Sequence, residues 1–138
     1  MKRYQIENII PFLFTILIVY FITSKFTLNT FFILGFLLSI IGIIIWWLGK
    51  LTLHNAFTAM PKAKKLMKKG IYSKIRHPIY FGLSLILIGW MILFQNWIIM
   101  IIFSSLIMIL IIRAYFEEKI LDKRFGKEYR TYKKETWF

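Results

Sequence analysis

The sequence lacks several of the side chains on which enzyme sites are often built. Its 138 residues include no cysteine and only two histidines, His54 and His77. The absence of cysteine excludes disulfide bonds, thiolate catalysis and cysteine-ligated zinc. His54 has no partner at the spacing of metal ligands, and two histidines without cysteine argue against a metal site made of protein side chains. We therefore expect chemistry that needs neither a thiolate nor a metal.

Acidic residues are also scarce. Six Asp and Glu stand against 19 Lys and Arg, which gives a formal net charge of +13. Apart from Lys25, the basic residues lie at the N-terminus, within residues 50–76 or from Arg113 onward. Basic residues gathered on one side of a bilayer follow the positive-inside rule and attract anionic headgroups. This distribution predicts a membrane protein with lipids as its neighbours, and not a nucleic-acid-binding protein.

Hydrophobic residues make up 59% of the chain and aromatic residues 19%. A soluble domain is usually about half apolar, so this composition favours a bilayer. The chain contains four apolar runs of about 15 to 19 residues. In lipid the backbone must satisfy its own hydrogen bonds, so each run predicts a transmembrane helix. We expect them to form one membrane-embedded domain, residues 1–138. The four runs are Ile9–Thr23, Phe31–Gly49, Ile79–Phe94 and Trp97–Ile112.

The connections between the runs predict the topology. The first run has no small-residue cleavage site, so we expect a retained span and not a signal peptide. Only Gln95 and Asn96 separate the last two runs, which predicts a tight antiparallel hairpin. If the basic segments are cytoplasmic, the protein is an integral, multi-pass membrane protein. Both termini and the active site then lie on the cytoplasmic side.

The tail from Glu117 to Tyr132 differs from the four runs because its apolar residues are spaced among charges. Ile120, Leu121, Phe125, Tyr129 and Tyr132 follow helical spacing. This pattern predicts an amphipathic helix at the membrane surface, broken or bent at Gly126. The expected fold class is therefore all-α, with about four transmembrane helices and a cytoplasmic amphipathic C-terminal helix.

The segment Gly70–Gly82 concentrates polar groups just before an apolar run. Pro78 is suited to the first turn of a helix, whose N-terminus carries free N–H groups and a partial positive charge that suit an anion. Lys74 and Arg76 would add positive charge to this end. His77, Tyr72 and Tyr80 could contribute a hydrogen-bonding ring and flat faces to a ligand. Alternatively, these residues are ordinary anchors at the membrane interface.

A second polar cluster follows the last apolar run. Arg113 and Glu117 are four residues apart, so they share a helix face and can pair or flank a ligand. Glu117 and Glu118 supply two of the chain's six acidic residues. A plain intrahelical ion pair beside a solvated neighbour explains these residues equally well.

Three motifs together resemble the isoprenylcysteine carboxyl methyltransferase family and the broader group that includes phospholipid N-methyltransferases. The similarity extends over roughly residues 50–133. The motifs are Gly-x-Tyr-x-x-x-Arg-His-Pro-x-Tyr-x-Gly at 70–82, Arg-x-x-x-Glu-Glu at 113–118, and Phe-Gly-x-x-Tyr-x-x-Tyr at 125–132.

The resemblance implies a membrane-embedded methyltransferase whose cofactor, S-adenosylmethionine, binds on the cytoplasmic side. It assigns Arg113 to the substrate and to catalysis, and it requires no metal. The residues that it assigns to cofactor binding are Lys64, Lys65, Leu66, Met67, Tyr72, His77, Pro78, Ile79, Tyr80 and Glu117.

The favoured function is methylation of a lipophilic small-molecule or lipidated substrate, as by an isoprenylcysteine carboxyl O-methyltransferase. Phospholipid N-methylation, for example of phosphatidylethanolamine, is the alternative enzyme, with Arg113 on the lipid phosphate. A non-enzymatic membrane protein that binds anionic lipid or a partner also stays open. So does a reductase-like relative with a nicotinamide cofactor, although the sequence has no Gly-rich dinucleotide fingerprint.

Overall fold

The computed structural model describes residues 29–54 and 66–137, and these are almost entirely helical. They contain no β-strand, only one isolated bridge between Ile75 and Trp137. The predicted all-α class is therefore confirmed for the described residues. Their elements are α2 (Thr30–His54), the short 3-10 helix η1 (Gly70–Ser73), α3 (Pro78–Phe94), α4 (Trp97–Phe125) and α5 (Lys127–Glu135).

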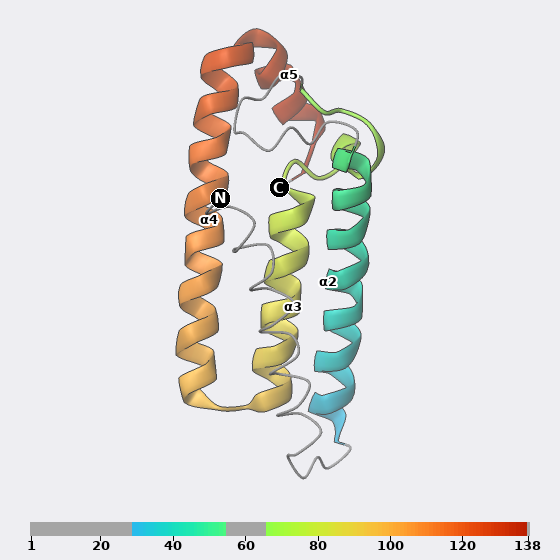
Figure 1. The fold of residues 1–138 in the computed structure, drawn as a ribbon, viewed down its shortest axis with the longest axis vertical. Coiled ribbons are helices and arrows are strands. Elements are labelled where there is room, and N and C mark those ends of the chain that lie inside the picture. Colours follow the sequence, from blue (N-terminus) through green and yellow to red (C-terminus); the bar gives the residue numbers. More distant parts are fainter. Residues whose placement is uncertain (1–28, 55–65, 138) are drawn as a thin grey trace, which may run out of the picture.

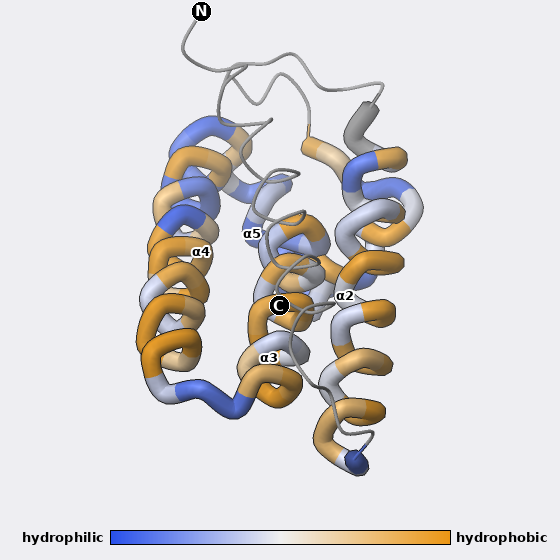
Figure 2. Tube along the Cα trace, turned by 60° about the horizontal axis from the view of Figure 1, so that its bottom comes forward, coloured by the Kyte–Doolittle hydropathy of each residue, from blue (hydrophilic) through white to orange (hydrophobic). Residues whose placement is uncertain are grey.

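The three long helices lie side by side, with α3 between α2 and α4 (Figure 1). Their directions alternate, so the end of α2, the start of α3 and the end of α4 lie at the same end of the bundle. Helix α5 and η1 lie at that end as well. Figure 2 shows hydrophobic residues along most of α2, α3 and α4, and hydrophilic residues at this end and at the α3–α4 turn. The polar chemistry of the chain is thus gathered at one end.

Helices α2 and α3 approach each other closely because glycines line their contact. A Cβ built on Gly42 would lie 2.7 Å from the carbonyl oxygen of Gly82, and one on Gly35 would lie 2.6 Å from that of Gly89. Without side chains at these four positions, the two backbones can pack together, as in other membrane helix pairs. These four glycines therefore serve helix packing.

The α3–α4 hairpin has the short link that the sequence predicts. Gln95 ends α3 in the left-handed conformation with φ of 46°. The Asn96 side chain then caps α4, accepting hydrogen bonds from the N–H groups of Ile98 at 2.9 Å and Ile99 at 3.3 Å. Helix α3 has 17 residues and α4 has 29, so α4 extends 12 residues further at the opposite end. At 1.5 Å per residue this extension is about 18 Å long, and it lies beside the segment that precedes α3.

Two described helices have the length and composition to cross a membrane, namely α2 over Thr30–Thr52 and α4 over Trp97–Phe125. Helix α3 is apolar but shorter. Of the four predicted spans, the run Ile9–Thr23 lies outside the described residues. The apolar side chains of α2 and α4 are largely exposed, with Ile44 52% and Ile109 52% accessible. These helices indicate association with a membrane, while the number of crossings stays a prediction.

The tail differs from the separate surface helix that the sequence predicts. Residues 117–125 continue α4 without interruption, and the chain turns at Gly126, where φ is +49°. Tyr129 and Tyr132 are buried and pack with Leu66. Leu121 and Phe125 complete this cluster, so most of the predicted apolar stripe faces the protein interior. The pattern indicated a helix correctly. Its apolar stripe, however, packs against Leu66 of the protein and not against the membrane surface.

The α2–α3 contact can be tested with Gly42→Ala. The added methyl group meets the Gly82 backbone, which cannot move without separating the helices, and such overpacking typically costs about 1–3 kcal/mol. We expect a lower midpoint of thermal unfolding in detergent, followed by circular dichroism. Gly49→Ala is the matched control, because its methyl group would meet the side chains of Ile79 and Pro78 at 3.1 and 3.3 Å. Equal stability of the two variants would contradict the backbone contact.

Candidate functional site

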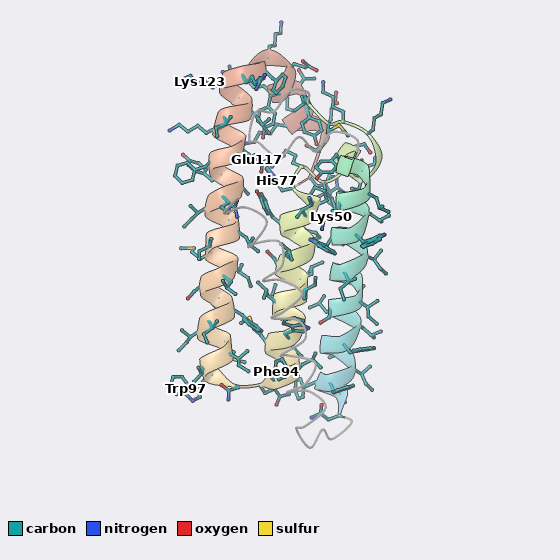
Figure 3. The ribbon with its side chains drawn as sticks, in the orientation of Figure 1. Lys50, His77, Phe94, Trp97, Glu117 and Lys123 are labelled. Atoms are coloured by element: carbon teal, nitrogen blue, oxygen red, sulfur yellow. The ribbon has the colours of Figure 1, made fainter. Side chains whose placement is uncertain are left out.

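The candidate site lies where the extension of α4 passes the segment that precedes α3. Figure 3 places His77 and Glu117 close together at this end of the bundle, opposite Phe94 and Trp97 at the hairpin turn. His77 is the residue just before α3, and Glu117 projects from α4. Two motifs that are 40 residues apart in sequence therefore meet.

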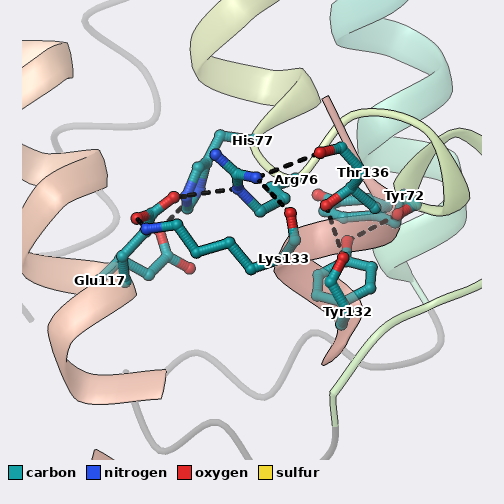
Figure 4. Close-up of polar contacts among 8 residues, drawn as sticks. Tyr72, Arg76, His77, Glu117, Tyr132, Lys133 and Thr136 are labelled. Atoms are coloured by element: carbon teal, nitrogen blue, oxygen red, sulfur yellow. Dashed lines mark hydrogen bonds and ion pairs between the residues drawn. The ribbon is translucent and has the colours of Figure 1, made fainter. Parts of the chain in front are cut away.

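His77 is buried, with 7% of its surface accessible, and its ring stacks on Tyr80 at 5.7 Å between centroids. Its Nδ1 lies 3.8 Å from Oε2 of Glu117, and its Nε2 lies 3.6 Å from Oε1 of Glu118 (Figure 4). Nε2 is buried without a hydrogen-bond partner. Burial lowers the pKa of His77, an effect that Arg76 adds to and that the two carboxylates oppose without cancelling. The ring is therefore neutral at neutral pH.

The two adjacent glutamates differ in their surroundings. The Glu118 side chain is 19% accessible and forms ion pairs with Nε of Arg76 at 3.0 Å and with Nζ of Lys133 at 2.6 Å. The Glu117 side chain is 49% accessible; its Oε2 lies 3.8 Å from Nδ1 of the neutral His77 ring, and it also interacts with the Tyr80 hydroxyl. Glu118 is thus occupied by protein cations, whereas Glu117 offers a carboxylate to a ligand.

Tyr72 lies in η1 and is buried. Its backbone carbonyl accepts a hydrogen bond from the hydroxyl of Tyr132 at 2.6 Å. Burial and the nearby Glu117 carboxylate raise the pKa of Tyr72 well above its usual value, so its phenol stays protonated. The charge of Glu117 thus acts on the Tyr72 side chain as well as on His77.

The structure brings together some of the predicted site residues but not all. Tyr72, His77, Tyr80 and Glu117 gather as described above. Arg113 is exposed one turn before Glu117 on α4, and the described residues show no ion pair between the two.

The remaining predicted cofactor residues lie in the segment before η1 or at the start of α3. Leu66 belongs to the cluster with Tyr129 and Tyr132. Pro78 and Ile79 lie against Gly49 of α2, and Pro78 is almost fully buried. Met67 is partly buried, while Lys64 and Lys65 lie outside the described residues. Leu66 and Pro78 are therefore packed within the protein.

Sequence reasoning misjudged Arg76 and missed its partners. We expected Arg76 to add positive charge for an anionic ligand, but its guanidinium pairs with Glu118 instead. Its Nη1 also donates to the backbone carbonyls of Lys133 at 3.1 Å and Thr136 at 3.2 Å. The scarcity of acidic residues was the available signal for this pairing. In a basic chain, two adjacent carboxylates can neutralise only a few of the many cations.

The neutral, buried state of His77 predicts a dependence of stability on pH. Its pKa is lowered in the folded protein, so below the ordinary value of about 6.5 the unfolded chain binds the proton more readily. Stability attributable to His77 is complete above pH 6.5 and is lost as the pH falls, with a slope of at most about 1.4 kcal/mol per pH unit.

We expect the unfolding midpoint of the wild type to fall between pH 7.5 and 5.5 by more than that of His77→Gln. The comparison isolates His77 because Glu117, Glu118 and Arg76 are the same in both proteins. Parallel pH profiles of the two proteins would argue against a neutral, buried imidazole.

The model of the phospholipid methyltransferase family matches residues 30–128. The match contains α2, α3 and α4, and therefore both motifs that form the site. No curated protein and no solved structure matches the chain. The chain belongs to the phospholipid methyltransferase family, within the group of membrane methyltransferases that its motifs resemble.

Proposed function

We propose that the protein is an S-adenosylmethionine-dependent methyltransferase that acts on a lipophilic substrate at the membrane. The observation that carries this proposal is the contact of His77 with Glu117 at the start of α3. It places an accessible carboxylate, a neutral imidazole and a helix N-terminus at the same polar end of an otherwise apolar bundle. Membership of a methyltransferase family supports the reaction class.

The chemistry of these groups fits the cofactor. S-adenosylmethionine, when bound, supplies a methyl group on a positively charged sulfonium. The N–H groups of the first turn of α3 suit its carboxylate. Glu117 suits its ammonium group or ribose hydroxyls, and Nε2 of His77 is a buried polar atom without a hydrogen-bond partner among the described residues. Lys64, Lys65 and Met67 remain further candidates from the resemblance.

The chain's contribution to the reaction is then mainly alignment. Methyl transfer is an in-line displacement, and well-oriented reactants gain about 7–11 kcal/mol relative to free ones. Arg113 is exposed on the same helix as Glu117, one turn closer to the apolar part of α4. Ile109, Ile112 and Phe116, around Arg113 in sequence, are also exposed. An acceptor could therefore place its polar group on Arg113 and its hydrocarbon along α4.

Two acceptors fit this arrangement. An ethanolamine phospholipid would place its phosphate on Arg113 and its amine toward Glu117, and the family description favours this class. An isoprenylcysteine would place its carboxylate on Arg113. For either acceptor, we place both termini and the site on the cytoplasmic side. The basic residues collect in the N-terminal segment, in residues 50–76 and in the tail, and basic segments usually face the cytoplasm.

Cofactor binding is tested by calorimetric titration of S-adenosylmethionine into the detergent-purified protein. We expect saturable binding that Glu117→Gln weakens about tenfold or more, since a charge-assisted hydrogen bond is lost. Glu128→Gln is the matched control, because Glu128 pairs with Lys68 and both side chains are exposed. Binding of NADPH instead would favour the reductase-like alternative. No binding of either compound to a folded sample would favour a non-enzymatic protein.

The acceptor is tested by methyl transfer in nanodiscs that contain phosphatidylethanolamine, or in detergent with farnesylcysteine. We expect one of the two to be methylated. Arg113→Gln should leave the affinity for S-adenosylmethionine unchanged and lower turnover about a hundredfold or more, the scale expected when alignment is lost. Unchanged turnover in this variant would remove Arg113 from the substrate site.

A further inference from the structure

The Glu118 carboxylate joins three parts of the chain that are distant in sequence. It lies on α4 and contacts Arg76 before α3 at 3.0 Å and Lys133 on α5 at 2.6 Å. It also lies 3.6 Å from Nε2 of His77. With 19% of its side chain accessible, Glu118 is shielded from solvent and held by protein cations.

Arg76 links the same carboxylate to the end of α5. Its Nη1 donates to the carbonyls of Lys133 and Thr136. Carbonyls at the end of a helix lack intrahelical partners and lie at the negative end of the helix dipole, so a guanidinium is a suitable cap. Arg76 therefore binds a side chain of α4 and the backbone end of α5 at the same time.

The C-terminal segment, residues 132–137, is attached along the segment that precedes α3. The Tyr132 hydroxyl donates to the carbonyl of Tyr72 at 2.6 Å, and the Trp137 N–H donates to the carbonyl of Lys74 at 2.8 Å. Ile75 and Trp137 also form the one isolated bridge of the described residues. Residues 72–77 are thus held by contacts from the C-terminal segment as well as by η1.

These contacts lie next to His77 in the sequence and in the structure. His77 follows Arg76 in sequence, and Glu117 precedes Glu118. The Arg76–Glu118 ion pair therefore brings the neighbouring pair, His77 and Glu117, to their 3.8 Å contact. Lys133 supplies the second cation on Glu118. It lies beyond residue 128, where the match to the family model ends.

We infer that Lys133 and Arg76 are positioning residues of the candidate site, which act through Glu118 and the C-terminal segment to hold His77 against Glu117. Neither residue needs to touch the cofactor or the acceptor. This inference rests on the proposed function of the site, but its structural part can be measured without any ligand.

The test uses Lys133→Met in the full-length, detergent-purified protein. Lys133 is half exposed, so its replacement should leave the fold intact. The exposed neighbour Lys134→Met is the matched control. In hydrogen exchange followed by mass spectrometry, we expect the amides of residues 72–77 to exchange faster in Lys133→Met and at the wild-type rate in Lys134→Met.

The same variants are then titrated with S-adenosylmethionine. We expect Lys133→Met to weaken binding about tenfold and Lys133→Arg to bind like the wild type. Lys133→Met should cause no further loss of affinity when it is added to Glu118→Gln, because the effects of coupled residues are non-additive. Wild-type exchange in Lys133→Met would overturn the inference. Faster exchange with unchanged affinity would reduce Lys133 to a structural residue and would also overturn it. If the wild type binds no cofactor, the proposed function fails, while the exchange experiment still decides whether Lys133 holds the segment.

Discussion

The arrangement of the polar end depends on one partly buried carboxylate. Glu118 is the point at which α4, α5 and the segment before α3 contact one another through charged side chains. A buried carboxylate is costly unless it is neutralised and hydrogen-bonded, and here two cations do both. Glu117, the residue before Glu118, is far more accessible. Two chemically identical residues thus have different surroundings because of their positions on one helix.

The parts of the fold that the sequence predicted correctly are those with local causes. Pro78 starts α3 because its missing N–H costs nothing in a first turn. Gln95 and Asn96 form the hairpin link because a left-handed residue and a capping side chain are sufficient there. Gly126 ends α4 where φ is positive. Each of these features requires information from only a few neighbouring residues, and all of it is present in the sequence.

The choice of partners could not be predicted in the same way. Arg76 has contacts 42, 57 and 60 residues away, and a sequence pattern does not indicate which distant group such a cation will meet. The tail shows the same limit, because its apolar stripe has a helical period whether it faces lipid or Leu66. The motifs single out Tyr72, His77, Tyr80 and Glu117, and the structure brings these four side chains together. The cations that organise them depend on tertiary contacts.

The two-residue link between α3 and α4 has a consequence for how the chain can vary. Because this link holds the two helices in register at one end, the length of α4 sets the height and direction of Glu117 at the other end. One residue inserted in the apolar part of α4 would rotate Glu117 by about 100° and shift it by about 1.5 Å. Substitution of one exposed apolar residue by another would do neither. The exposed apolar positions of α4 can therefore exchange one apolar residue for another, whereas the length of this part of the helix is restricted.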